Sequence, residues 1–164
     1  NPDAAALSVL ATVLRNGFLH TAIREKGGAY GAGATNDTAT NTFKFFSYRD
    51  PKCRETFSAF QDAIEWSKTS ITKQHLEEAI LGVVSSIDKP LSPVGEAKND
   101  FNLNLEDIST QERLAMRQRV INCSIKDLIR VSEKYLTKPS KKSILAGEAY
   151  KEEASELGLT LREV

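Results

Sequence analysis

Histidine and cysteine are scarce: the 164 residues include two of each. His75-Leu76-Glu77-Glu78 begins like the zinc helix HxxEH, but Ala79 stands where that motif needs its second histidine. A zinc site needs about three converging protein ligands, so we expect no metal in this chain. Cys53 and Cys123 form no CxxC motif and are expected to be reduced thiols, which favours a reducing compartment over a disulfide-forming one.

Excess charge is also lacking, because 22 basic residues balance 22 acidic ones. That balance argues against a nucleic-acid partner. No apolar run reaches membrane-spanning length, so no membrane partner is expected. The nucleophile motif GxSxG is missing, and the glycines follow a helix and precede a strand, the reverse of a dinucleotide-binding turn. The chain begins without methionine and is expected to be part of a longer polypeptide.

Apolar spacing and turn chemistry predict an α+β fold, with an antiparallel sheet and helices packed on one of its faces. Few strands are predicted for so much helix, which suggests a missing first strand before Asn1 or a partner sheet elsewhere. The expected elements are a helix over 3–18, strands over 29–36 and 40–49, a helix from the Asp50 N-cap to about 67, a helix after Thr72, a loop over 89–98, helices from Ser109 and Ser124, a strand over 143–147 and a charged helix from Tyr150.

A glycine-rich stretch joins the first predicted helix to the first predicted strand. Four of the nine glycines lie between positions 27 and 33, and Arg24 and Tyr30 flank Gly27-Gly28. On spacing alone, the favoured interpretation is structural, with Arg24 paired to a surface carboxylate and Tyr30 packed on the sheet. The alternative is that the turn directs both side chains to one point, where they would bind a peptide carbonyl or its oxyanion. The backbone near Gly31 could then accept an extended peptide.

Two motifs carry a resemblance: IREKGGAYG at residues 23–31 and FSYRDP at residues 46–51. With this separation they resemble the C-terminal half of pitrilysin/insulinase-family zinc metallopeptidases, and within that family the presequence protease (falcilysin-like) branch. The likeness extends to about Leu136. It implies that residues 1–164 form one C-terminal domain, of the metallopeptidase LuxS/processing-peptidase type, of a larger two-halved peptidase.

The resemblance further implies a role for the turn. Arg24 and Tyr30 would bind the substrate carbonyl at a zinc ion held by the N-terminal catalytic half, and Gly27, Gly28 and Gly31 would contact substrate. The full-length protein would be a zinc endopeptidase for short unfolded peptides, located in a bacterial cytoplasm or an organelle matrix. This fragment, which lacks the metal motif, would be inactive alone. The alternative is a non-catalytic peptide-binding or assembly subunit with the same fold.

Overall fold

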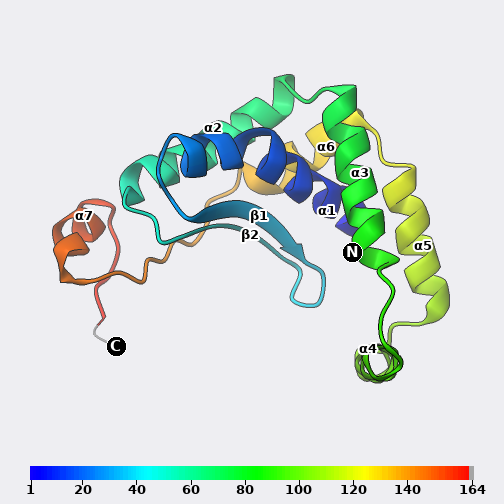
Figure 1. The fold of residues 1–164 in the computed structure, drawn as a ribbon. Coiled ribbons are helices and arrows are strands. Elements are labelled where there is room, and N and C mark those ends of the chain that lie inside the picture. Colours follow the sequence, from blue (N-terminus) through cyan, green and yellow to red (C-terminus); the bar gives the residue numbers. More distant parts are fainter. Residues whose placement is uncertain (163–164) are drawn as a thin grey trace.

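The structure is a computed structural model that describes residues 1–162. Figure 1 shows helices on one side of a two-stranded antiparallel sheet, with α7 set apart near the C-terminus. The predicted α+β class with helices on one sheet face is therefore confirmed. The elements are α1 (Ala4–Leu14), the π-helix η1 (Arg15–Glu25), β1 (Gly31–Asp37), β2 (Thr42–Tyr48), α2 (Cys53–Thr69), α3 (Lys73–Ile87), α4 (Pro93–Leu105), α5 (Thr110–Ile121), α6 (Ile125–Val131), the π-helix η2 (Ser132–Leu136), the 3₁₀ turn η3 (Glu148–Tyr150) and α7 (Lys151–Glu156).

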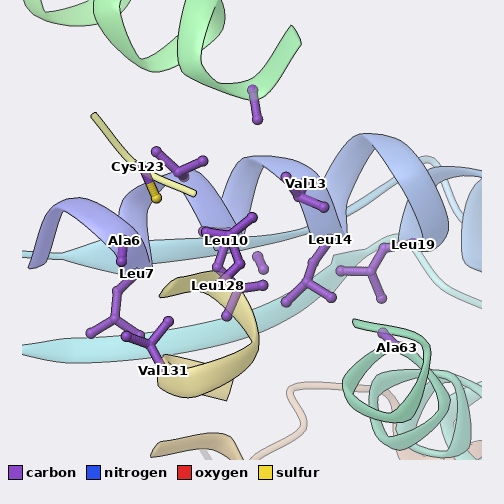
Figure 2. Close-up of a cluster of buried hydrophobic side chains, with 14 of the residues drawn as sticks. Ala6, Leu7, Leu10, Val13, Leu14, Leu19, Ala63, Cys123, Leu128 and Val131 are labelled. Atoms are coloured by element: carbon purple, nitrogen blue, oxygen red, sulfur yellow. The ribbon is translucent and has the colours of Figure 1, made fainter. Parts of the chain in front are cut away.

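Helix α1 is the centre of the hydrophobic core (Figure 2). The sequence pattern predicts an apolar stripe, yet apolar side chains are buried on nearly every side of this helix. A helix that is hydrophobic all round is stable only when neighbours surround it. Here Leu10 and Leu14 are fully buried, Leu128 and Val131 approach from α6, and Ala63 approaches from α2.

The first helical segment continues past residue 18 as η1 and runs through Gly17. A Cβ atom at Gly17 would lie 2.7 Å from the indole of Trp66, so glycine allows α2 to pack closely here. Contrary to the sequence-based expectation, Ala4–Glu25 is long and apolar enough to span a membrane, but half of its most apolar window is buried inside the protein. Its apolar residues are accounted for by the core.

The sheet is a hairpin in which Gly31 pairs with Tyr48 and Asp37 with Thr42. One face meets the helices: the Asn36 side chain donates to the Ala4 carbonyl and the Ser8 hydroxyl of α1, and Phe45 stacks on Phe60 of α2. The alternate β2 residues Thr42, Lys44, Phe46 and Tyr48 are exposed. This alternation is typical of an antiparallel sheet that is covered on one side.

Two predicted elements and one predicted helix cap are wrong. Residues 93–105, expected partly as a loop, form α4, because Ser92 caps the backbone N–H of Gly95 and Pro93 suits the first helical turn. Residues 143–147 form no strand, and Leu145 is 89% exposed. The second long helix starts at Cys53, and Asp50 is not its N-cap.

Three other predicted helix starts are confirmed. Thr72, Ser109 and Ser124 each accept a hydrogen bond from the backbone N–H three residues later. These hydroxyls satisfy donors that a helix N-terminus otherwise leaves unpaired. Cys53 and Cys123 are free thiols, as expected, and burial raises the pKa of the Cys123 thiol to about 11.

Candidate functional site

The turn between η1 and β1 depends on two glycines. Gly28 has a φ of 85°, a left-handed conformation that glycine adopts without strain. A Cβ atom at Gly27 would lie 2.4 Å from the carbonyl oxygen of Ile23, which leaves no room for a side chain. The Gly28 N–H donates to the Arg24 carbonyl and the Ala29 N–H to the Ile23 carbonyl, which closes the end of the helix in the manner of a glycine C-cap.

Arg24 lies on the exposed surface just before this turn. Its guanidinium Nη1 is 3.0 Å from Nε2 of His20, one helical turn earlier. Nδ1 of the same imidazole is 3.3 Å from a carboxylate oxygen of Glu25. Because the guanidinium can only donate, Nε2 accepts and the ring proton lies on Nδ1, facing Glu25. Arg24 is thus oriented by His20 rather than paired directly with a carboxylate.

Tyr30 lies on the other side of the turn, and 68% of its surface is exposed. Its backbone N–H donates to the carbonyls of Tyr48 and Arg49, which attaches it to the end of β2. The Tyr30 ring meets the edge of the Tyr48 ring, with centroids 6.0 Å apart. No hydrogen bond of its hydroxyl is found within residues 1–162, and the exposure of the side chain leaves this donor accessible to solvent.

The corner between β2 and α2 supports the turn from the other side. Asp50 accepts a hydrogen bond from the Lys52 N–H at 2.9 Å and another from the buried Thr56 hydroxyl at 2.5 Å. Pro51, next in the chain, is the nearest neighbour that a Cβ atom at Gly28 would meet, at 3.8 Å. The two sequence motifs at residues 23–31 and 46–51 are therefore parts of one structural unit.

We call Arg24, Gly27, Gly28, Tyr30 and Gly31 the turn site. The fold places both large polar side chains of the turn site on the exposed surface, on either side of one rigid bend, with no contact between guanidinium and phenol. A Cβ atom at Gly31 would meet nothing within 4 Å, so the backbone there is open to approach. Of the purely structural interpretation, one part is wrong and one is found: Arg24 contacts His20 and no carboxylate, whereas the Tyr30 ring does pack against Tyr48 of the sheet.

Sequence reasoning missed two neighbours of the turn site. His20 lies four residues before Arg24, and this spacing on a helix is the signal that the two side chains could meet. Arg49 was interpreted as the end of a strand. Only the register, which pairs Gly31 with Tyr48, brings Arg49 to Tyr30.

A metal ion does not fit this part of the protein. Within residues 1–162, no three His, Cys, Asp or Glu side chains are grouped so that they could hold one. The acidic and imidazole groups nearest the turn, Glu25 and His20, are already engaged with each other and with Arg24.

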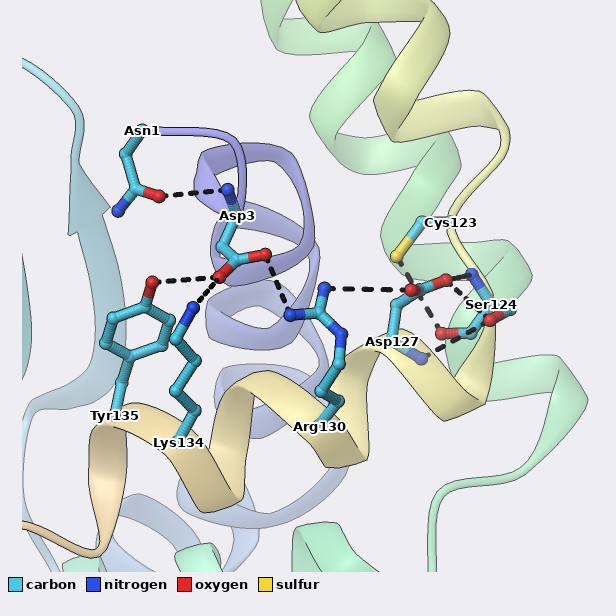
Figure 3. Close-up of polar contacts among 8 residues, drawn as sticks. All are labelled: Asn1, Asp3, Cys123, Ser124, Asp127, Arg130, Lys134 and Tyr135. Atoms are coloured by element: carbon cyan, nitrogen blue, oxygen red, sulfur yellow. Dashed lines mark hydrogen bonds and ion pairs between the residues drawn. The ribbon is translucent and has the colours of Figure 1, made fainter.

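Another arginine and tyrosine lie at the start of α1, where both donate to a buried carboxylate of the protein itself (Figure 3). Asp3, 6% exposed, receives hydrogen bonds from Lys134 and Tyr135 and an ion pair from Arg130, each at 2.8 Å. The hydrogen bonds of Lys134 and Tyr135, with the charge of Arg130, hold the pKa of Asp3 well below its usual range. We call these four residues the Asp3 cluster.

Comparison with known proteins decides the family. The family described as "PreP C-terminal domain" matches residues 3–145, which include both motifs and the whole turn site. The chain belongs to this family. The predicted presequence protease branch of the pitrilysin family is thereby confirmed.

Curated relatives of the PreP C-terminal domain agree. Mitochondrial presequence proteases of Xenopus tropicalis and Mus musculus are each 41% identical to this chain, over 84% and 83% of its length. That of Schizosaccharomyces pombe is 36% identical over 86%. The matched segment is 13% of the first two relatives and 14% of the third, so the chain spans about one seventh of their length.

Proposed function

We propose that this PreP C-terminal domain supplies the substrate-carbonyl site of a zinc metalloendopeptidase that degrades short unfolded peptides. Arg24 and Tyr30 would donate hydrogen bonds to the carbonyl oxygen of the bond to be cut, and to the oxyanion that forms there. The observation that carries the proposal is a guanidinium and a phenol, both exposed, held on either side of a bend that no residue larger than glycine fits.

The physical argument concerns charge that develops during the reaction. When a nucleophile adds to a peptide carbonyl, the oxygen becomes anionic, and donors already in place stabilise it without reorganising. Arg24 offers a permanent charge and several N–H donors, and Tyr30 offers one O–H donor. His20 holds Arg24 at 3.0 Å, and the β2 carbonyls hold the backbone of Tyr30. Their donors toward solvent remain available to a ligand.

Gly31 would accept the peptide backbone beside these donors. Its α-carbon faces open space, whereas Gly33, two residues on, is covered by Arg15 and Phe46. An extended peptide would therefore approach at the start of β1 and not along its whole length. Gly27 and Gly28 would act on substrate through the shape of the turn, because both positions are needed for the bend itself.

Zinc would be held by an N-terminal half of the full-length protein, because the residues described here do not fit a metal ion. Zinc, when bound there, would activate the attacking water. That half is also the proposed partner of apolar surface exposed on α4, where Val94, Phe101 and Leu105 are each at least 63% exposed. The fragment alone would be inactive. Because the relatives are named mitochondrial, we place the full-length protein in an organelle matrix.

The sheet would be completed by a strand that precedes Asn1 in the full-length protein. Residues of β2 and residues 143–146 line one cavity of about 940 Å³, and Asn1 lines it too. Within residues 1–162, β2 pairs with β1 alone. An inserted strand would pair with β2 and give residues 143–147 the partner that the predicted strand lacks.

The test uses the full-length enzyme and an unstructured peptide. We expect Arg24→Ala to lower kcat/KM by about 10²-fold, the effect of removing one oxyanion donor. Tyr30→Phe, which keeps the ring and removes only the hydroxyl, should lower it by about tenfold or more. Lys26→Ala, an exposed cation in the same turn, is the matched control and should retain full activity.

Three results would contradict parts of the proposal. Full activity of both Arg24→Ala and Tyr30→Phe would remove the turn site from catalysis. Peptide turnover that a chelator leaves unchanged would contradict the proposed role of zinc. Binding of peptide without turnover would favour the alternative of a non-catalytic subunit.

A further inference from the structure

We propose that Arg49 is a positioning residue that orients the phenol of Tyr30. This inference rests on the proposed function of Tyr30 and adds to it a group in the second motif that does not itself touch the substrate. Its experiment separates a failure of this inference from a failure of the proposed function.

The guanidinium of Arg49 lies beside two tyrosine rings. Its Cζ is 5.8 Å from the ring centroid of Tyr30 and 5.4 Å from that of Tyr48. The two rings meet edge to face, with centroids 6.0 Å apart. A guanidinium within about 6 Å of a ring centroid is attracted by the π-electrons. Arg49 therefore links the two rings into one aromatic cluster on the exposed side of the hairpin.

Tyr30 has few other contacts that could orient its ring. The side chain is 68% exposed, and its hydroxyl has no hydrogen-bond partner within residues 1–162. An exposed aromatic side chain exchanges between rotamers on a picosecond-to-nanosecond timescale unless neighbours restrict it. The restricting neighbours here are Tyr48 and Arg49.

The backbone of Arg49 is held in an unusual conformation that favours this contact. Its φ is 47°, one of few positive values at non-glycine residues in the described chain. Its carbonyl, together with that of Tyr48, accepts the Tyr30 N–H. Asp50 fixes the corner that follows through its bonds to Lys52 and Thr56. The same residue thus anchors the backbone of Tyr30 and covers its ring.

The experiment is a double-mutant cycle in the full-length enzyme, with kcat and KM measured on an unstructured peptide. Arg49→Ala should lower kcat about five- to tenfold with little change in KM, because a misdirected hydroxyl stabilises the oxyanion less well. Arg49→Lys, which keeps a cation near the rings, should recover at least half of the lost activity. In a Tyr30→Phe background, Arg49→Ala should cause less than a twofold further loss, because the hydroxyl that it positions is gone.

Two controls distinguish positioning from folding. Arg49→Gly relieves the positive φ and removes the side chain, so it should unfold at the same or a higher temperature and still lose kcat. Arg54→Ala removes a nearby exposed arginine that pairs instead with Glu156, and it should leave kcat unchanged.

The outcomes separate as follows. Normal kcat in Arg49→Ala, with reduced activity in Tyr30→Phe, overturns this inference alone. An equal loss from Arg49→Ala in the presence and absence of the Tyr30 hydroxyl also overturns it, because Arg49 would then act independently. Normal activity of Tyr30→Phe overturns the proposed role of the phenol and this inference with it, and normal activity of Arg24→Ala as well overturns the proposed function.

Discussion

The Asp3 cluster and the turn site each contain an arginine and a tyrosine, and the environments of the two sites differ. In the Asp3 cluster, Arg130 and Tyr135 direct their donors at one buried carboxylate that lies between them. At the turn site, Arg24 meets an imidazole, and the Tyr30 hydroxyl faces solvent. The same chemical groups thus serve the fold where an internal acceptor saturates them. At the turn site His20 accepts from only one nitrogen of Arg24, so the other donors of Arg24 and the Tyr30 hydroxyl are available to a ligand.

The comparison gives the two sites opposite expectations. Substitutions in the Asp3 cluster should lower the free energy of unfolding, because a buried acceptor ties α1 to the end of α6 and to η2. Substitutions of the Arg24 and Tyr30 side chains at the turn site should spare stability and lower activity in the full-length enzyme.

The largest expected stability effect is that of Asp3→Ala. The substitution removes the carboxylate that accepts from three charged or polar partners. We expect the free energy of unfolding to fall by about 3 kcal/mol. This is the lower end of the range for breaking a buried ion pair, because Arg130 and Lys134 are half exposed. Urea denaturation of the domain measures it. Arg24→Ala, the matched change at the turn site, should stay within about 0.5 kcal/mol of wild type. Equal losses of unfolding free energy in the two variants would contradict the expected difference between the two sites.

Gly27→Ala should have the next largest effect, because its Cβ would lie 2.4 Å from the Ile23 carbonyl oxygen. We expect a loss of about 2 kcal/mol as the end of η1 shifts, with loss of peptide turnover in the full-length enzyme. Thermal denaturation and a peptide-cleavage assay check the two parts. A fully stable and active variant would show that the turn is not built around this position.

The third largest expected effect is that of acid, which should weaken the Asp3 cluster. The pKa of Asp3 is lowered in the folded state, so its contribution is present above the unfolded value near 3.8 and is lost as pH falls below it. From pH 7 to pH 3 the expected loss at this group is about 1 kcal/mol. Denaturation curves of wild type and Asp3→Asn at both pH values isolate it. The variant should show a flatter pH dependence, and parallel curves would contradict the assignment.

The smallest expected effect on folding is that of Gly31→Ala. A Cβ there meets nothing within 4 Å, so the free energy of unfolding should change by less than about 0.5 kcal/mol. In the full-length enzyme, the methyl group should still raise KM for an extended peptide, because it occupies the open approach to the backbone. An unchanged KM would mean that peptide does not approach the start of β1.

Local signals accounted for much of the fold. The capping residues Thr72, Ser109 and Ser124 were recognisable because an N-cap and its partner lie within one turn of chain. The aromatic run in β2 was recognisable as a strand for the same reason. Residues 143–147 have the composition of a strand, yet a strand needs a partner, and local composition does not show whether one is present. Pro93 favoured a loop in the sequence, although Ser92 and Pro93 together start a helix.

The sequence by itself determined the family and the glycine bend, and it singled out Arg24 and Tyr30 as candidate site residues. All of these depend on residues that lie close together in the chain. Only the tertiary structure decided that Arg49 lies beside Tyr30 and that Asp3 is enclosed by Lys134 and Tyr135. The physical reason is that a side-chain donor stabilises the fold when a segment distant in the chain supplies its acceptor, and is otherwise available to a ligand. Which distant segment lies beside a donor depends on packing and strand register.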